Sequence, residues 1–250
     1  MIKYFSVMKK FFKILKSRWF IYGSLSIVTF LVLVFPNTIK YYARKLLHAK
    51  NVYSVVKRYE KEVDSRLKPH YENASIQYPG KKLTFLINKD KLTLKLYAGT
   101  NFGKMRLIKT YPILANSGLP GPKLKQGDQQ IPEGIYKIEY FNPNSRYHLS
   151  MKINYPNAFD LEMAKQDKRN KPGYDIFIHG KNVSIGCVAI GDPGIEELFV
   201  LSNSVSKENI KVIIIPNNFK EQSKIDKILK RSPEWTKKLY GDLQQELNKI

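Results

Sequence analysis

Y-D-I-F-I-H-G-K-N-V-S-I-G-C-V-A-I, residues 174–190, is the stretch that places the reactive groups of this chain in its fold. It holds the only cysteine among 250 residues, Cys187, which follows His179 by eight positions. The aromatic and β-branched residues at its start predict a short buried strand ending at His179, and residues 188–190 predict the start of another. The two reactive side chains therefore flank a single connecting segment.

A thiol beside an imidazole is a minimal constellation for acyl transfer. A free cysteine has a pKa of about 8.5, and a neighbouring imidazolium can lower it by several units. Gly186 has no side chain where backbone N–H groups would approach a substrate carbonyl, so these amides are candidates for an oxyanion hole. The alternative is that Cys187 is inert core filling and His179 merely ends a strand, which is the commoner fate of an arbitrary Cys and His.

The wider pattern resembles the L,D-transpeptidase (YkuD) catalytic domain family, in which His-Gly is followed by Ser or Thr, any residue, Gly and Cys. The order of histidine before cysteine agrees with that family and is the reverse of the papain-like order. The resemblance covers roughly residues 53–216 and is closest to the YafK-like murein L,D-transpeptidase branch. It is carried by T-Y-P-I-L-A-N-S-G (110–118), G-P-K-L-K-Q-G-D (121–128), P-E-G-I-Y (132–136), N-P-N-S-R-Y-H (142–148) and Y-P-N-A-F-D (155–160).

The resemblance implies a mainly β fold, a YkuD-like β-sandwich catalytic domain with a few short helices. It implies Cys187 as the nucleophile and His179 as the general base and acid. No acidic partner for the imidazole is apparent, and a backbone carbonyl is expected to orient it. Ser184 matches the Ser or Thr of the motif and is expected to support the site, with a simple turn hydroxyl as the alternative. Candidate substrate contacts are Tyr155, Asn157, Ser117, Gly118, Tyr147 and His148.

Two positions depart from the wider family. Ile185 stands where many members have a second histidine, and Ala189 stands where many have an arginine. Both departures, like the short interval between His179 and Cys187, resemble the YafK-like pattern. They leave open whether an amine or water resolves the thioester.

Members of the family act on peptidoglycan stem peptides, at a D-centre beside the L-centre of a diamino acid. They form L,D cross-links or attach protein to the wall, and YafK-like members are also associated with cutting such attachments. The resemblance thus implies a peptidoglycan L,D-transpeptidase of cell wall remodelling. The alternatives are a hydrolase or amidase that releases wall-linked lipoprotein, and a non-catalytic wall- or membrane-binding protein.

An uncharged apolar run, W-F-I-Y-G-S-L-S-I-V-T-F-L-V-L-V-F (19–35), follows a basic N-terminus (1–18). It has the minimum length of a membrane helix, and the positive-inside tendency keeps the N-terminus in the cytoplasm. No A-x-A-like cleavage site follows it. These features predict an uncleaved signal anchor in the inner membrane with the catalytic domain in the periplasm of the cell envelope. A buried helix of a soluble protein is the alternative.

The chain carries a formal net charge of +22, from 43 Lys and Arg against 21 Asp and Glu. No nucleic-acid recognition pattern is present and an exported domain would not meet nucleic acid, so we expect no nucleic-acid partner. Anionic head groups and wall polymers fit the predicted location, although a lysine-rich background composition is an alternative. The four histidines are scattered and no C-x-x-C, Walker A or Rossmann pattern occurs, which predicts neither a metal nor a cofactor.

The remaining sequence divides into a helical linker (36–80), the catalytic domain (81–216) and a basic helical tail (217–250). Apolar residues recur every three or four positions from 52 to 67 and predict an amphipathic helix. Asp192 begins a predicted helix as its N-cap, and N-I-K-V-I-I-I-P (209–216) predicts a fully buried strand. The tail is interpreted as a solvated helical appendage, with a wall- or membrane-facing accessory as the alternative. Further strands are predicted at 83–87, 92–97, 105–114, 135–141 and 147–153.

Overall fold

The computed structural model describes residues 49–100, 103 and 105–250, together with 22, 23, 29, 34–38 and 40. It divides into two compact units, Met1–Ala49 and Lys50–Ile250, and the second unit contains the sheet and the reactive pair. The predicted basic N-terminus and most of the predicted membrane anchor lie outside the described residues. No helix within the described part of the chain combines the length and hydropathy that a membrane span requires.

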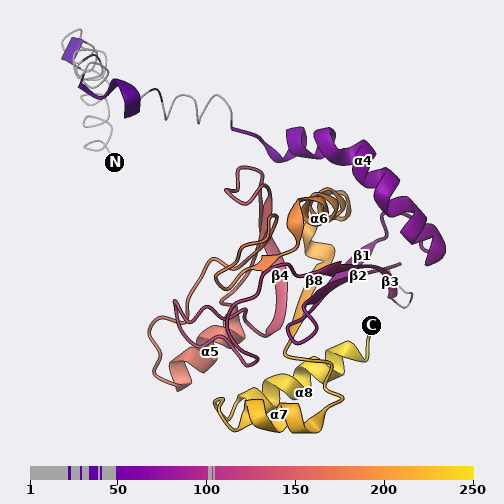
Figure 1. Cartoon of the computed structure of the whole chain (residues 1–250), viewed down its shortest axis with the longest axis vertical. Coiled ribbons are helices and arrows are strands. Elements are labelled where there is room, and N and C mark those ends of the chain that lie inside the picture. The colour runs from indigo at the N-terminus through magenta and orange to yellow at the C-terminus, as the bar shows by residue number, and fades with distance from the viewer. Residues whose placement is uncertain are drawn as a thin grey trace, which may run out of the picture. The chain divides into compact units, whose positions relative to one another are not determined.

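Eight strands form one continuous, curled sheet in the order β3-β2-β1-β8-β4-β5-β6-β7 (Figure 1). Most neighbours are antiparallel, but β8 runs parallel to β1, and β7 runs parallel to β6. The strands are β1 (Lys82–Asn88), β2 (Thr93–Gly99), β3 (Arg106–Pro112), β4 (Gly134–Asn142), β5 (Ser150–Ile153), β6 (Phe177–His179), β7 (Val188–Ala189) and β8 (Ile210–Ile215).

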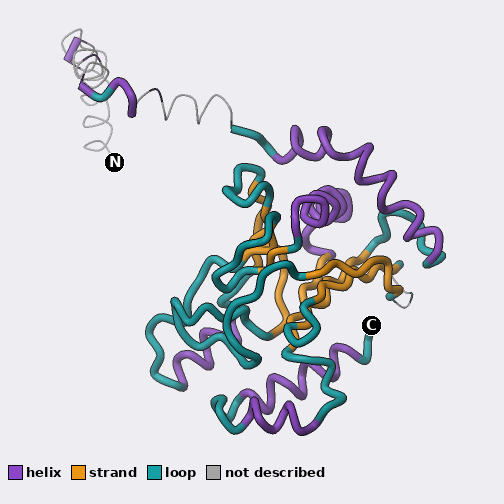
Figure 2. The backbone as a smooth tube through the Cα atoms, in the orientation of Figure 1, coloured by secondary structure: helices purple, strands orange, loops and turns teal. Residues whose placement is uncertain are grey.

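The fold is mixed α/β, so the expectation of a mainly β sandwich is only partly right. β8 lies between β1 and β4 and joins the strands into one half-barrel, and the register shifts between Ile138 and Tyr140, an irregularity of the kind that bends a sheet. Figure 2 shows helices on both sides of the strands. The helices are α4 (Val52–Asn73), α5 (Ala158–Gln166), α6 (Gly191–Val205), α7 (Gln222–Leu229) and α8 (Thr236–Leu247), with a 3₁₀ turn η1 (Lys207–Asn209).

The amphipathic helix predicted at 52–67 is confirmed as α4, which continues past Pro69 to Asn73. Asn51 caps its first turn by accepting a hydrogen bond from the backbone N–H of Ser54 at 2.7 Å. The apolar stripe, including Val63 and Leu67, is buried and packs against α6. The linker helix is therefore part of the catalytic fold.

Alternate residues of β8 enter two different cores, because both faces of the sheet are covered. Val212 and Ile214 belong to the core under α4 and α6, and Ile213 belongs to a second core under α7 and α8. Burial on both faces explains the unbroken apolar run of this strand. Tyr240 and Leu243 of α8 are buried in the second core, so the tail is not the solvated appendage that we expected.

The start of α6 differs from the prediction. The helix begins at Gly191, its N-cap position is Ile190, and no side chain caps it. Asp192 instead accepts a hydrogen bond from the backbone N–H of Lys181 through Oδ1 at 2.8 Å. The carboxylate thus ties the segment after His179 to the helix, a long-range contact that a local capping pattern cannot reveal.

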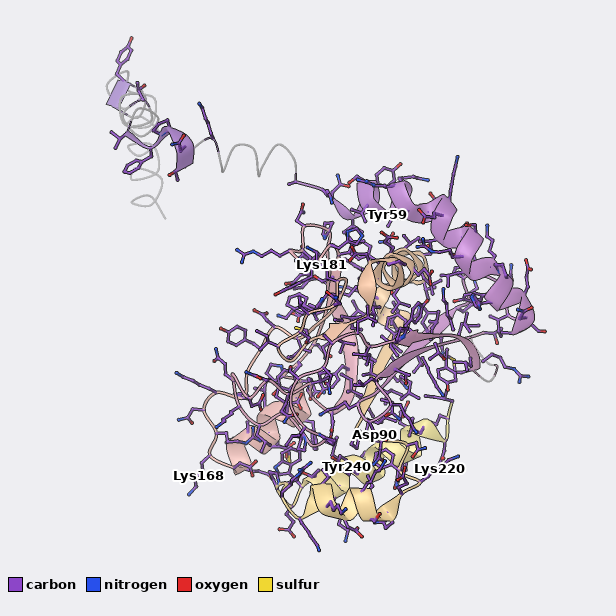
Figure 3. The ribbon with its side chains drawn as sticks, in the orientation of Figure 1. Tyr59, Asp90, Lys168, Lys181, Lys220 and Tyr240 are labelled. Atoms are coloured by element: carbon purple, nitrogen blue, oxygen red, sulfur yellow. The ribbon has the colours of Figure 1, made fainter. Side chains whose placement is uncertain are left out.

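A buried ion pair holds the glycine- and proline-rich segment that precedes β4. The side chains of Lys89 and Glu133 are 2% and 0% exposed and lie 2.9 Å apart. Lys89 Nζ also donates to the carbonyls of Gly121 and Ile131 at 2.7 and 2.8 Å. Glu133 accepts from the hydroxyl of Tyr240, labelled in Figure 3, at 2.7 Å. The pair therefore ties the loop, the sheet and α8 together.

Replacing Lys89 with Met is expected to lower the free energy of unfolding by about 3–5 kcal/mol, because the carboxylate of Glu133 would stay buried without its counter-charge. Urea unfolding followed by circular dichroism measures the change. The exposed Lys91→Met variant is the control and should change stability little. The double variant Lys89→Met/Glu133→Gln should recover part of the loss, and a loss below about 1 kcal/mol in the single variant would contradict the account.

Candidate active site

The pairing of β6 with β7 brings His179 and Cys187 onto neighbouring strands. Ile178 lies opposite Val188 and His179 lies opposite Ala189, while Cys187 immediately precedes β7. Neighbouring strands are about 4.8 Å apart. The predicted strands and their connecting segment are thus present, and they place the thiol-bearing and imidazole-bearing segments side by side.

The imidazole of His179 is buried and oriented by its own neighbour. It is 2% exposed, and Nδ1 lies 2.6 Å from the carbonyl oxygen of Gly180. Because a carbonyl only accepts, Nδ1 carries the proton and Nε2 is the free base of the neutral ring. Burial lowers the pKa of His179, and the Gly180 carbonyl opposes this shift. A neutral imidazole with a basic Nε2 is the form that a general base requires.

The thiol of Cys187 lies in a half-buried position, with Sγ 3.7 Å from the backbone carbonyl of Asp175. Burial raises the pKa of this thiol and the charge of Asp175 adds to the rise, whereas the backbone N–H of Phe177 and the ammonium of Lys123 oppose it. Burial therefore favours a neutral thiol and a neutral imidazole at rest. This pair differs from the thiolate–imidazolium pair considered from the sequence, because burial disfavours both charged forms.

The rate at which iodoacetamide alkylates Cys187 is therefore expected to rise steadily with pH from about 6 to about 9.5. Below the thiol pKa the thiolate fraction grows about tenfold per pH unit. Mass spectrometry of the intact protein measures the rate, with Cys187→Ala as the background. A plateau across neutral pH would indicate a preformed thiolate–imidazolium pair and contradict this electrostatic account.

Two serine hydroxyls accept hydrogen bonds from backbone N–H groups near the thiol. Ser184 Oγ accepts from the backbone N–H of Cys187 at 2.9 Å and donates to its carbonyl at 2.7 Å. Ser117 Oγ accepts from the backbone N–H of Gly186 at 2.7 Å and donates to the carbonyl of Gln129 at 2.8 Å. Ser184 thus shapes the turn that carries the thiol, and Ser117 joins that turn to the loop before β4.

Gly186 adopts a backbone conformation, with positive φ, that favours glycine. Its φ is +93°, and a Cβ at this position would lie 3.2 Å from the carbonyl oxygen of Gln130. Its N–H was expected to face a substrate carbonyl, but in this structure it donates to Ser117. An oxyanion role for Gly186 stays a prediction, and it requires the substrate to displace the Ser117 hydroxyl.

The segment between β3 and Ser117 is positioned by β7. The backbone N–H of Leu114 donates to the carbonyl of Ala189 at 2.8 Å, which brings the segment after β3 beside the Cys187 turn. Gly118 follows with φ +81°, and a Cβ there would lie 2.6 Å from Oε1 of Gln130. The structure therefore brings Ser117 to the thiol-bearing turn and gives Gly118 a conformational role beside it.

The ammonium of Lys123, in the loop before β4, favours a lower pKa of the Cys187 thiol. The sequence motifs did not identify Lys123 as a residue of the site. Its Nζ lies 2.5 Å from Oδ1 of Asp128, and Asp128 also accepts from the backbone N–H groups of Leu124, Lys125 and Gln130. These bonds lower the pKa of Asp128 against the opposing effect of its burial. In the sequence, the only indication of this pair is that Lys123 and Asp128 both lie in the quoted run 121–128.

Tyr147 and His148 lie on the His179 side of the site. The rings of Tyr147 and His179 are 4.6 Å apart between centroids and inclined by 34°. His148, at φ +73°, places Nε2 2.8 Å from Glu196 of α6, and Glu196 also pairs with Arg66 of α4 at 3.2 Å. The segment 147–148 is thus held by α6 and, through Arg66, by α4. The helix after Asp192 was expected to lie just behind the Cys187 strand, whereas the contribution of α4 to this segment was not predicted.

Figure 3 labels Tyr59 on α4 and Lys181 beside α6. The Tyr59 ring meets His148 edge-on, with centroids 5.8 Å apart. A side chain on Gly180 would collide with the Asp192 carboxylate and the Tyr147 carbonyl, 2.5 and 2.7 Å from its Cβ. The His-Gly of the motif is therefore required by close packing as well as by chemistry.

Tyr155 and Asn157 have structural partners rather than contacts with Cys187. Tyr155 is 3% exposed and its hydroxyl donates to the carbonyl of Pro172 at 2.8 Å. Asn157 caps α5 in a reciprocal pair with Asp160, and its Nδ2 donates to the carbonyl of Ile135 at 3.1 Å. This arrangement favours a positioning role over the direct substrate contact implied by the resemblance. The helix α5 itself was not predicted.

Within the described residues, no three His, Cys, Asp or Glu side chains gather closely enough to hold a metal ion. The chemistry that the site can be seen to supply comes from the thiol, the imidazole and backbone groups. A thiol and a neutral imidazole are the groups that nucleophilic attack by sulfur with proton transfer to a histidine requires.

Comparison with known proteins gives a consistent result. The profile of the YkuD L,D-transpeptidase catalytic domain matches residues 79–214. The protein named "Putative L,D-transpeptidase YafK" from Escherichia coli K12 is 37% identical over 125 residues, which are 49% of this chain and 48% of that protein. The Escherichia coli O157:H7 protein of the same name matches equally. The match thus spans about half the length of these relatives.

Solved structures give weaker similarity. The helical cell shape determining protein Pgp2 from Campylobacter jejuni is 24% identical, with a TM-score of 0.45 over 56% of this chain and 50% of that one. Bd1075 from Bdellovibrio bacteriovorus is 23% identical, with a TM-score of 0.41 over 61% and 54% of the two chains.

Proposed function

This chain belongs to the YkuD family of L,D-transpeptidase catalytic domains, and from that premise we propose that it is a peptidoglycan L,D-transpeptidase acting through a cysteine thioester. The single observation that supports the proposal is the β6–β7 register, which pairs the strand ending at His179 with the strand that begins directly after the only thiol of the chain. Nδ1 of His179 faces the Gly180 carbonyl, which leaves Nε2 as the free base. No cofactor is needed for this chemistry.

The proposed acylation moves one proton and one acyl group. His179 Nε2 takes the thiol proton as Cys187 Sγ attacks the carbonyl carbon of a stem peptide at its L,D centre. The peptide C–N bond then breaks, and the imidazolium returns the proton to the departing amine. The products are a thioester on Cys187 and a free amine, with His179 neutral again.

The second half-reaction decides between transferase and hydrolase. His179 Nε2 accepts a proton from an incoming amine or from water, and the new C–N or C–O bond forms. The C–S bond then breaks, and the imidazolium returns the proton to Sγ, which restores the neutral thiol and the neutral imidazole. We propose transfer to an amine as the main outcome. Hydrolysis of peptidoglycan-linked lipoprotein is the second candidate, because residues of the segments holding the site expose apolar side chains suited to a protein partner, among them Leu119, Val183 and Ile185.

The proposed location is the cell envelope, with the catalytic domain in the periplasm and residues 19–35 as an inner-membrane anchor. The uncharged composition of that run and the basic residues before it support this placement. The assay should therefore use the full chain solubilised in detergent.

The deciding experiment incubates the full chain with muropeptides and, separately, with peptidoglycan carrying wall-linked lipoprotein, and resolves the products by mass. New L,D-linked dimers support transpeptidation. Release of lipoprotein without any new L,D bond would replace transfer by hydrolysis as the outcome. The absence of both products would contradict the proposed activity.

The non-catalytic alternative has a separate test. Exposure of the folded protein to a carbapenem should add one drug mass to the intact chain, because Cys187 would be acylated by the β-lactam carbonyl. The adduct should be absent from Cys187→Ala. No adduct on the native protein, or one that persists in the variant, would favour a binding protein with an inert thiol.

A further inference from the structure

A cavity of about 710 Å³ lies on the sheet face that α7 and α8 only partly cover, and neither His179 nor Cys187 lines it. Its walls come from β1, β4 and β8, from the start of α5 and from the end of α8. A volume of this size is in the range of small-molecule sites, about 300–1,000 Å³. The cavity therefore has the dimensions of a ligand site separate from the reactive thiol.

Three neighbouring strands contribute a row of three residues to the lining of the cavity, and the two lysines of this row are exposed to solvent. Lys211 of β8 lies opposite Thr84 of β1 on one side and opposite Lys137 of β4 on the other. The next row along β8 contains Ile213, which is covered by α7 and α8. The end of α8 reaches the Lys211 row through Glu246, and this row sets two lysines directly opposite each other. Like charges in this position destabilise a sheet unless an anion lies between them.

The carboxylate of Glu246 offsets part of the positive charge of the lysine row. Glu246 of α8 pairs with Lys211 and with Lys249, at 2.8 Å in the second pair. No ion pair is found for the Lys137 ammonium among the residues that the structure describes. One exposed lysine of this row, Lys137, is therefore left without a counter-charge among the described residues.

The rest of the lining combines apolar side chains with polar and charged ones, among them Lys82, Asn154 and Glu208. Ile135, Phe159 and Met105 contribute to the walls beside the lysine row. A ligand that fits this lining has an apolar body for the walls and an anionic end for Lys137 and Lys211. An inorganic anion would leave the apolar walls unfilled, and a neutral hydrocarbon would leave Lys137 uncompensated.

We propose that this cavity binds a single-chain amphiphile whose head group is a carboxylate or a phosphate. The head group lies between Lys137 and Lys211, and the chain lies along Phe159 and Met105. The proposal does not depend on the reaction at Cys187, and a result for one site leaves the other unaffected.

Dodecyl phosphate below its micelle concentration is the probe, titrated by calorimetry into the full chain held in amphipol without detergent. One molecule is expected to bind per chain. Lys137→Glu should weaken binding at least about tenfold, because a head-group contact is replaced by repulsion. Ala158→Phe, at the wall of the cavity, should weaken it by narrowing the space for the chain.

Lys61→Glu is the matched control, with the same change of charge at an exposed site on α4, over the opposite face of the sheet. It should bind as the native protein does. Equal weakening by Lys61→Glu and Lys137→Glu would overturn the proposal, because it would show a general effect of net charge. No binding by the native protein, or binding unchanged in Lys137→Glu, would overturn it as well.

A bilayer lipid and a soluble amphiphile share this chemistry, and a second arm of the experiment separates them. The full chain is reconstituted with and without phosphatidylglycerol before the titration with dodecyl phosphate. Competition of the lipid with dodecyl phosphate at the Lys137 site assigns a bilayer source. Binding of dodecyl phosphate that the anionic lipid does not affect assigns a soluble source.

Discussion

Replacing Cys187 with Ala is expected to lower the rate of product formation from muropeptides by at least about 10⁴-fold, since the only thiol of the chain is removed and no thioester can form. Residual turnover would come only from binding and from polar groups around the scissile bond. The measurement is single-turnover formation of the new L,D bond or of released acceptor, resolved by mass. Cys187→Ser, which keeps an oxygen nucleophile of much higher pKa, should also be severely impaired.

The control for this prediction is the stability of the Cys187→Ala variant, which shows whether its fold is retained. The thiol is half-buried and its polar contacts are with backbone groups of Asp175 and Phe177, so Cys187→Ala should unfold at a urea concentration close to that of the native protein. Activity in Cys187→Ala within about tenfold of native would contradict the thioester mechanism. A large loss of stability would show that the loss of activity has a structural cause.

Replacing His179 with Ala should lower kcat by about 10²–10⁴-fold, the usual contribution of a positioned general base and acid. A large effect is expected because burial raises the pKa of the thiol, so the thiol needs a base to lose its proton during attack. The loss should therefore be largest near neutral pH and shrink as hydroxide deprotonates the thiol at higher pH. The measurement is a pH profile of kcat for both proteins.

His70→Ala is the comparison variant, because His70 lies on α4 outside the site. It should keep the native pH profile. A His179→Ala enzyme whose kcat falls by the same factor at every pH would contradict general-base catalysis and would point to a loss of packing beneath Tyr147 instead.

Much of the secondary structure could be predicted from the sequence because its causes are local. The apolar stripe from 52 to 67 specifies α4, and the apolar run from 209 to 216 specifies β8 buried on both faces. The helix α5 was missed because its signal is an Asn157–Asp160 cap with a short, weakly amphipathic body. Asp192 was misassigned as a cap because its partner, Lys181, belongs to another segment.

The resemblance to the YkuD family, seen in the quoted motifs, is confirmed by the family match over residues 79–214. What the motifs could not show is how the site is supported. Ser117 and Lys123 reach the Cys187 region through a loop that the buried Lys89–Glu133 pair holds in place. Glu196 reaches it through His148. Such contacts join residues far apart in the chain, and no local pattern encodes them.

The sequence by itself indicated Cys187 and His179 as the candidate pair, the order of histidine before cysteine, and the strands that end at His179 and begin after Cys187, because hydrophobic periodicity and residue chemistry are properties of short segments. Only the tertiary structure decided that one curled sheet replaces the expected sandwich and that Gly186 gives its N–H to Ser117. It also decided that burial disfavours the charged forms of the thiol and the imidazole. Register, burial and electrostatic environment are set by the whole packed molecule, and a linear motif does not contain them.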